Sequence, residues 1–277
     1  MLKTLRGEPI SLSDLTYLFL FCPNNSGTTV LSQYLASQID GYLPPYGNNE
    51  GQMVPAVRKM MRERPWNASI DYDWAFIRAA WDDLRDGRIF VEGSPPNLLR
   101  FDSIREVFGQ DSSAVISICD PYQHIASCMK RYDRHPGVEA TAWLEKADRI
   151  REIRDKNPHL PFIPYEDFVQ DPRVVNRMLG LPERDYRIDG KKGSEITGIS
   201  SAYCRGIGFL ERDDILAASE VLEPHRSLLA DFGYAVAGPD LLDMVAARNP
   251  AEFSIGVDAR QAWTASHAAR HAAGAAH

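Results

Sequence analysis

Four short apolar runs alternate with segments of helical periodicity along this chain, and that alternation restricts the fold more than any other feature. The apolar runs cover residues 16–21, 88–92, 114–119 and 161–165. Between the first two runs, residues 28–39 carry apolar side chains at the spacing of one helix face. Strands that are connected through helices pair in parallel, because the crossover returns the chain to the same end of the sheet. The pattern predicts an α/β fold, doubly wound, with a central parallel sheet flanked by helices.

No linker rich in glycine, proline or serine divides the chain, and its 277 residues are compatible with one large α/β domain. We therefore predict a single domain over residues 15–234. Residues 1–14 would form an N-terminal extension, and residues 235–277 a C-terminal tail that ends in a run rich in alanine and histidine.

Charge and composition exclude several classes of protein. The 31 basic and 38 acidic residues give a net charge of −7, which disfavours binding to nucleic acid or to an anionic membrane surface. The longest apolar stretch, Leu15 to Cys22, is far shorter than the roughly 20 residues of a membrane-spanning helix. It also lacks the cleavage site of a signal peptide. We expect a cytoplasmic protein, and the sequence carries no signal for its oligomeric state.

The cysteines and histidines give no sign of a metal centre. The four cysteines form no C-x-x-C pair, and no histidine stands near them at a metal-ligand spacing. The sequence therefore predicts reduced, mostly buried thiols and no metal site.

The segment between the first apolar run and the helix that follows it is the most informative part of the chain. It reads Cys-Pro-Asn-Asn-Ser-Gly-Thr-Thr over residues 22–29. A strand, a tight turn and a helix N-terminus together present backbone N–H groups and hydroxyls to an anion. The segment is not a Walker A loop, which needs a glycine at position 22 and a lysine at position 28. An ordinary strand-to-helix turn, with asparagine and glycine supplying its geometry, is the alternative interpretation.

Residues 23–29 resemble the loop with which sulfotransferases bind the 5′-phosphosulfate of 3′-phosphoadenosine 5′-phosphosulfate (PAPS). Further segments are similar to elements of that family and follow in the family's order: Glu92 to Arg100, Cys119 to Tyr122 with Ser127, Pro164 to Phe168, Asp171-Pro172 with Leu179 to Pro182, and Leu228 to Tyr234. The resemblance implies a P-loop-containing, sulfotransferase-like fold of the bacterial type. It also implies transfer of a sulfuryl group from PAPS, without a metal, to a hydroxyl or amine of a small-molecule acceptor.

The resemblance also assigns residues to the donor site. Asn25, Ser26, Gly27, Thr28 and Thr29 would bind the 5′-phosphosulfate. In the same way, Cys119 and Ser127 correspond to the element that holds the 3′-phosphate, and Lys192 to a basic-glycine segment that covers it. For Lys192, a solvated surface loop is the alternative.

Three positions at which the family places a cation are neutral in this chain. They are Asn25, Gly93 and Cys119. A charge-assisted hydrogen bond contributes roughly 1.5 to 3 kcal/mol, so the sequence predicts weakened donor binding.

Two glutamates are candidates for the general base that would deprotonate the acceptor. Glu50 follows Gly47-Asn48-Asn49, which is similar to the setting of a family glutamate. Its alternative role is that of an acidic residue at a helix N-terminus. Glu92 ends a predicted strand and would face the ligand crevice, or else pair with an arginine.

Two functions of different class stay open at this point. One is a PAPS-dependent sulfotransferase. The other is a sulfotransferase-like protein that has lost or changed its use of the donor and acts as a binding or regulatory partner.

Overall fold

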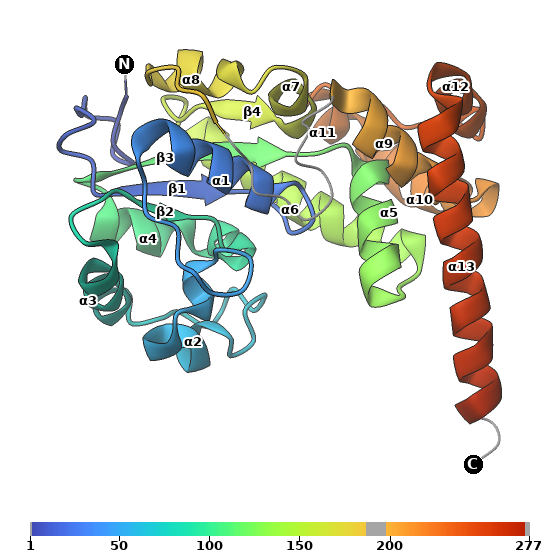
Figure 1. Ribbon diagram of the computed structural model, residues 1–277, viewed down its shortest axis with the longest axis horizontal. Coiled ribbons are helices and arrows are strands. Elements are labelled where there is room, and N and C mark those ends of the chain that lie inside the picture. The colour runs from blue at the N-terminus through green and yellow to red at the C-terminus, as the bar shows by residue number, and fades with distance from the viewer. Residues whose placement is uncertain (1, 187–197, 275–277) are drawn as a thin grey trace. The chain divides into compact units, whose positions relative to one another are not determined.

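The computed structural model describes residues 2–186 and 198–274, so the predicted donor-site residue Lys192 lies outside the described residues. The chain forms two compact units (Figure 1). The first, here called the sheet unit, consists of residues 1–118 and 146–196. The second, the helical unit, consists of residues 119–145 and 197–277. The domain boundaries at residues 15 and 234 stay a prediction.

The sheet unit contains a four-stranded parallel sheet, which confirms the predicted α/β fold. Its strands are β1 (Tyr17–Phe21), β2 (Phe90–Glu92), β3 (Ser112–Ile118) and β4 (Phe162–Pro164). They lie in the order β2-β1-β3-β4, and every pairing is parallel. After the edge strand β2, the chain crosses over β1 to form β3. Because β1 and β2 pair in parallel, their carboxyl ends lie side by side.

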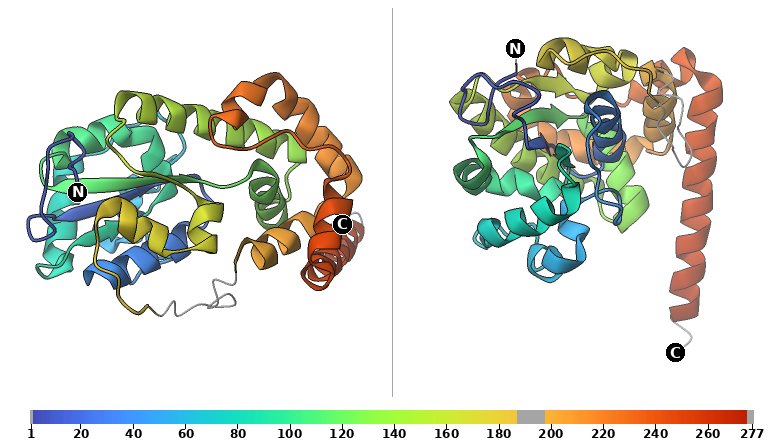
Figure 2. Two further views of the ribbon diagram at one scale, coloured as in Figure 1. Left: turned by 90° about the horizontal axis from the view of Figure 1, so that it is seen from above. Right: turned by 60° about the vertical axis from the view of Figure 1, so that its left-hand side comes forward.

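Both faces of the sheet are buried, because the side chains of β1 are apolar on both sides: leucines point to one face and aromatic rings to the other. Leu18 and Leu20 belong to a core cluster with residues of α1, α7 and α8. Tyr17 and Phe19 point to the opposite face, where their rings contact Trp81 of α3 and Phe108 of α4. The left-hand view of Figure 2 looks along the edge of the sheet, with α1 on one side and α4 on the other.

The helices of the sheet unit are α1 (Thr28–Ile39), η1 (Gly51–Met53), α2 (Pro55–Met61), α3 (Trp74–Arg85), η2 (Pro95–Arg100), α4 (Phe101–Phe108), α7 (Tyr165–Gln170), α8 (Arg173–Leu179) and the C-terminal part of α6 (Pro136–Lys156). The predicted N-terminal extension packs against this unit. Leu5 is fully buried, and its backbone N–H donates to the carbonyl of Ser112 at 2.9 Å.

The described part of the helical unit contains helices alone. They are α5 (Pro121–Tyr132), the N-terminal part of α6, α9 (Gly198–Gly208), α10 (Arg212–Leu222), η3 (Glu223–His225), α11 (Arg226–Ala230), α12 (Leu241–Arg248) and α13 (Pro250–Gly274). Helix α13, which covers most of the predicted tail, crosses α9 at two glycines. A Cβ at Gly256 would lie 2.4 Å from the carbonyl oxygen of Arg205, so the two backbones touch there. No helix in the described ranges is both long enough and apolar enough to span a membrane.

Candidate functional site

The loop between β1 and α1 lies where the carboxyl ends of β1 and β2 meet, the position at which open parallel sheets bind ligands. Two of its residues have left-handed backbone, Asn25 with φ 58° and Gly27 with φ 77°. Gly27 occupies the N-cap position of α1. Ser26 and Thr28 are buried, and Thr29 is half-buried. The loop thus leads directly into the positive end of a helix dipole, which favours an anion.

Gly27 allows an aromatic ring to lie directly against the loop. A Cβ built on Gly27 would stand 1.8 Å from Cε2 and 2.4 Å from Cζ of Tyr165, the first residue of α7. No side chain fits at such distances. The close approach of this ring requires glycine, as does the positive φ.

Cys22 fixes the start of the loop. Its thiol donates to Oγ1 of Thr28 at 3.3 Å, which closes the loop on itself. Burial raises the pKa of the Cys22 thiol to about 12, so the group stays protonated at neutral pH. Cys22 is therefore a buried structural thiol and not a nucleophile.

A lysine from α6 supplies a cation to the loop. Nζ of Lys146 donates to Oδ1 of Asn24 at 2.8 Å and lies 4.9 Å from the centre of the Trp66 ring. Sequence reasoning missed this residue. It stands 122 positions from Asn24 in a long charged helix, where a lysine carries no signal of its own.

Two of the three neutral positions are explained by their surroundings. At Gly93 a Cβ would lie 3.1 Å from Cγ2 of Thr28 and 3.6 Å from Cβ of Ser32, so α1 packs against the backbone there. A side chain at residue 93 would require the Thr28 methyl group to shift by a few tenths of an ångström. Asn25 stands in a left-handed conformation that asparagine tolerates better than arginine or lysine.

Glu92 is fully buried at the end of β2, and hydrogen-bond donors surround it. Its Oε2 accepts from the N–H of Gly51 at 2.7 Å. Its Oε1 accepts from the N–H of Ser94 at 3.0 Å and from Nδ2 of Asn97 at 2.9 Å. Burial raises the pKa of the Glu92 carboxyl to about 7, while the hydrogen bonds from Ser94 and Gly51 oppose that shift. The Gly51 contact fastens the loop around residue 51 to β2, and the other two hold the segment that follows β2.

Glu50 lies at the same edge of the sheet and is half-buried. Nε2 of Gln52 donates to its Oε2. The Glu50 charge acts on both neighbours, because it helps to raise the pKa of Cys22 and that of Glu92. Unlike the fully buried Glu92, Glu50 is partly accessible.

The residues predicted for the 3′-phosphate belong to the helical unit. Cys119 is fully buried, and its carbonyl accepts from Nε1 of Trp143 at 3.0 Å. Ser127 is half-buried on α5. Their roles, and that of Lys192, stay predictions.

Arg100, the first arginine after β2 in sequence, has its guanidinium engaged by backbone carbonyls of the fold. Its guanidinium donates to the carbonyls of Pro65, Asn67, Ile70 and Pro96. It also lies 4.2 Å from the centre of the Tyr72 ring. Arg100 thus holds residues 65–70, the segment before α3, in place.

Comparison with known proteins found no family model and no curated protein that matches the sequence. Among solved structures, a sulfotransferase from Alicyclobacillus acidocaldarius is 16% identical with a TM-score of 0.49, over 78% of this chain and 95% of the other. The sulfotransferase domain of the curacin biosynthetic pathway is 16% identical with a TM-score of 0.42, over 84% and 97%. The sulfotransferase domain of an olefin synthase from Synechococcus PCC 7002 is 17% identical with a TM-score of 0.44, over 61% and 74%.

The chain resembles bacterial sulfotransferases. The activities named for these three structures are those of the compared proteins.

Proposed function

We propose that the protein is a sulfotransferase that moves a sulfuryl group from PAPS to a hydroxyl or amine of a small-molecule acceptor. The observation that carries the proposal is the anion-binding loop at the end of β1, with Lys146 beside it. The loop combines a left-handed glycine at the N-terminus of α1 with a cation 2.8 Å from Asn24. Both features favour a phosphosulfate group.

The reaction needs charge stabilisation and removal of one proton. The donor supplies the sulfuryl group, and its bridging oxygen leaves with the nucleotide as the bond from sulfur to the acceptor oxygen or nitrogen forms. In this chain the N–H groups that open α1 and the Lys146 ammonium would stabilise the oxyanion charge. The Glu50 carboxylate would accept the acceptor's proton. Glu92 would keep Glu50 in place through Gly51.

Titration calorimetry with 3′-phosphoadenosine 5′-phosphate, the product nucleotide, tests donor binding. We expect the parent protein to bind this nucleotide more tightly than ATP. Replacing Lys146 by methionine keeps the aliphatic stem and removes the charge. Loss of one charge-assisted contact, roughly 1.5 to 3 kcal/mol, should weaken the affinity by about tenfold to a hundredfold.

Lys156→Met is the matched control, because it removes a charge from the same helix at a residue that is 60% exposed and paired with Glu152. We expect nearly unchanged affinity in this variant. Equal losses in the two variants would mean that only the net charge matters and would remove Lys146 from the site. No binding of either nucleotide by the parent would contradict the proposal.

Glu50→Gln tests the base. With an acceptor that supports turnover, we expect the rate constant to fall by about 10² or more, the usual worth of general-base catalysis. Affinity for 3′-phosphoadenosine 5′-phosphate should change little, because glutamine keeps the shape and the contact with Gln52. A rate near that of the parent would exclude Glu50 as the base.

The second candidate function, a binding or regulatory partner with altered donor use, is favoured by one observation. Position 93, where the family places a cation, is a glycine, and a Cβ there would press against the Thr28 methyl group at 3.1 Å. If the nucleotide fails to bind to a folded parent protein, this function becomes the better explanation of the fold.

A further inference from the structure

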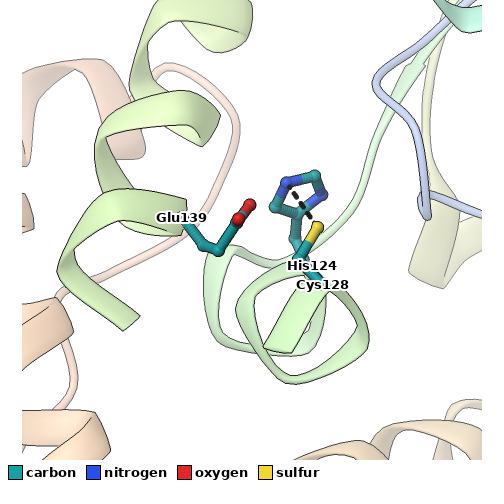
Figure 3. A group of neighbouring side chains, drawn as sticks. All are labelled: His124, Cys128 and Glu139. Carbon is teal, nitrogen blue, oxygen red and sulfur yellow. Dashed lines mark hydrogen bonds between the residues drawn. The ribbon is translucent and has the colours of Figure 1, made fainter. Parts of the chain in front are cut away.

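Three side chains capable of binding a metal meet inside the helical unit (Figure 3). His124 and Cys128 stand one turn apart on α5, and Glu139 comes from the first turn of α6. One ligand atom from each lies within 4.8 Å of the others. All three side chains are buried, with exposed fractions of 0%, 0% and 2%.

The spacing of the two helical ligands matches a tetrahedral zinc site. Zinc bonds are about 2.0 Å long to histidine nitrogen and about 2.3 Å to cysteine sulfur, so these ligand atoms lie about 3.5 Å apart around a tetrahedral ion. Nε2 of His124 and Sγ of Cys128 are 3.4 Å apart. The two atoms form a hydrogen bond in the structure, and their separation is already that of two ligands of one ion.

The charges of the cluster also suit a divalent cation. A thiolate from Cys128 and the carboxylate of Glu139 would together neutralise a doubly charged ion, with His124 as a neutral ligand. The Glu139 carboxylate has one ion pair in the described structure, to Arg134 at 3.5 Å, and that arginine is 58% exposed. A buried neutral cluster avoids the high cost of an uncompensated buried charge.

We propose that His124, Cys128 and Glu139 form a zinc site. The mixture of nitrogen, sulfur and oxygen ligands favours zinc over calcium or magnesium, which prefer oxygen alone. Three protein ligands leave a fourth position for water. This inference does not rest on the proposed sulfuryl transfer, because it uses neither the loop nor Lys146, Glu50 or Glu92.

This proposal differs from the sequence-based expectation of no metal site. Only two of the ligands are close in the chain, and the H-x-x-x-C spacing matches none of the common zinc motifs. The third ligand follows on another helix.

The test is a titration of the full-length protein, freed of metal with a chelator, with cobalt(II) as a spectroscopic substitute. We expect visible bands of tetrahedral cobalt and a near-ultraviolet band from the thiolate. Both should saturate at about one equivalent and vanish when zinc is added. One equivalent of zinc should also raise the unfolding temperature, because it binds the folded chain.

Three variants decide the assignment. Cys128→Ser should abolish the thiolate band, and Cys204→Ser, at a buried cysteine of α9, should keep it. Glu139→Gln preserves the shape of the cluster and should weaken zinc binding by more than the roughly 10- to 100-fold caused by loss of an outer-shell partner. If Cys128→Ser does not fold, the Glu139→Gln titration decides.

Binding by the tail histidines His267 and His271 would give no thiolate band and would survive all three substitutions. Such a result would overturn the proposal, and so would the absence of a saturable cobalt spectrum. In either case His124, Cys128 and Glu139 would be a packed buried cluster only.

Discussion

Replacing Glu92 by alanine should lower the free energy of unfolding by about 3 kcal/mol or more. The carboxylate accepts hydrogen bonds from Gly51, Ser94 and Asn97, and all three of these residues are buried. Alanine leaves these donors without their acceptor, and each unsatisfied buried donor costs roughly 1 to 3 kcal/mol. Urea denaturation monitored by circular dichroism measures the loss.

Glu63→Ala is the control, because Glu63 is exposed and lies in the same unit. We expect a change within about 0.5 kcal/mol for this variant, as for most surface substitutions. A Glu92→Ala protein as stable as the parent would show that water replaces the carboxylate and that the loop around Gly51 does not depend on it.

The pH dependence of the free energy of unfolding provides a second test of the role of Glu92. Burial raises the pKa of Glu92 to about 7 from an ordinary value of 4.5. The folded state therefore holds the proton more tightly than the unfolded state. The stability that this group contributes is fully present below about pH 4.5 and is lost as the pH rises through 7. Relative to Glu92→Gln, the parent should lose stability across that window, and parallel pH profiles would contradict the raised pKa.

Replacing Gly27 by alanine should disrupt the loop and abolish nucleotide binding. The new Cβ would lie 1.8 Å from the Tyr165 ring, so either the ring or the loop has to move. The positive φ adds a cost of roughly 1 to 2 kcal/mol. We expect the unfolding free energy to fall by more than this backbone cost, and affinity for 3′-phosphoadenosine 5′-phosphate to fall below detection by calorimetry.

Gly87 provides a matched control for the backbone cost. Its φ is +72°, and within the described chain no heavy atom lies within 4 Å of the added Cβ. Gly87→Ala should therefore show the cost of the positive φ alone, with nucleotide binding intact. Equal destabilisation at Gly27 and Gly87 would mean that the Tyr165 ring moves aside freely and does not define the loop.

The elements nearest the loop could be predicted from the sequence because local patterns determine them. The helix predicted over residues 28–39 has those bounds in the structure, since an apolar face, a preceding glycine and a following turn all act within a few residues. Helices α10 and α11 are separated by a 3-10 segment at Glu223–His225, which contains Pro224. Proline cannot donate the backbone hydrogen bond that would continue the helix.

The contacts that give the site its chemistry could not be predicted in this way. Lys146 reaches Asn24 across 122 positions, and Glu92 meets Gly51 across 41. No local pattern records such pairs, because the packing of the sheet and its helices creates them. The arginine partner considered for Glu92 was wrong for the same reason: the described structure satisfies its carboxylate with two N–H groups and an amide.

The packing of α1 against β2 also bears on how this chain could evolve. The methyl group of Thr28 stands 3.1 Å from where a Cβ at residue 93 would lie. A lysine at residue 93 is therefore hindered while threonine stands at 28. Serine at 28 would remove that methyl group and keep the hydroxyl. Positions 28 and 93 are therefore coupled: a basic residue at 93 should be tolerated better beside serine at 28 than beside threonine.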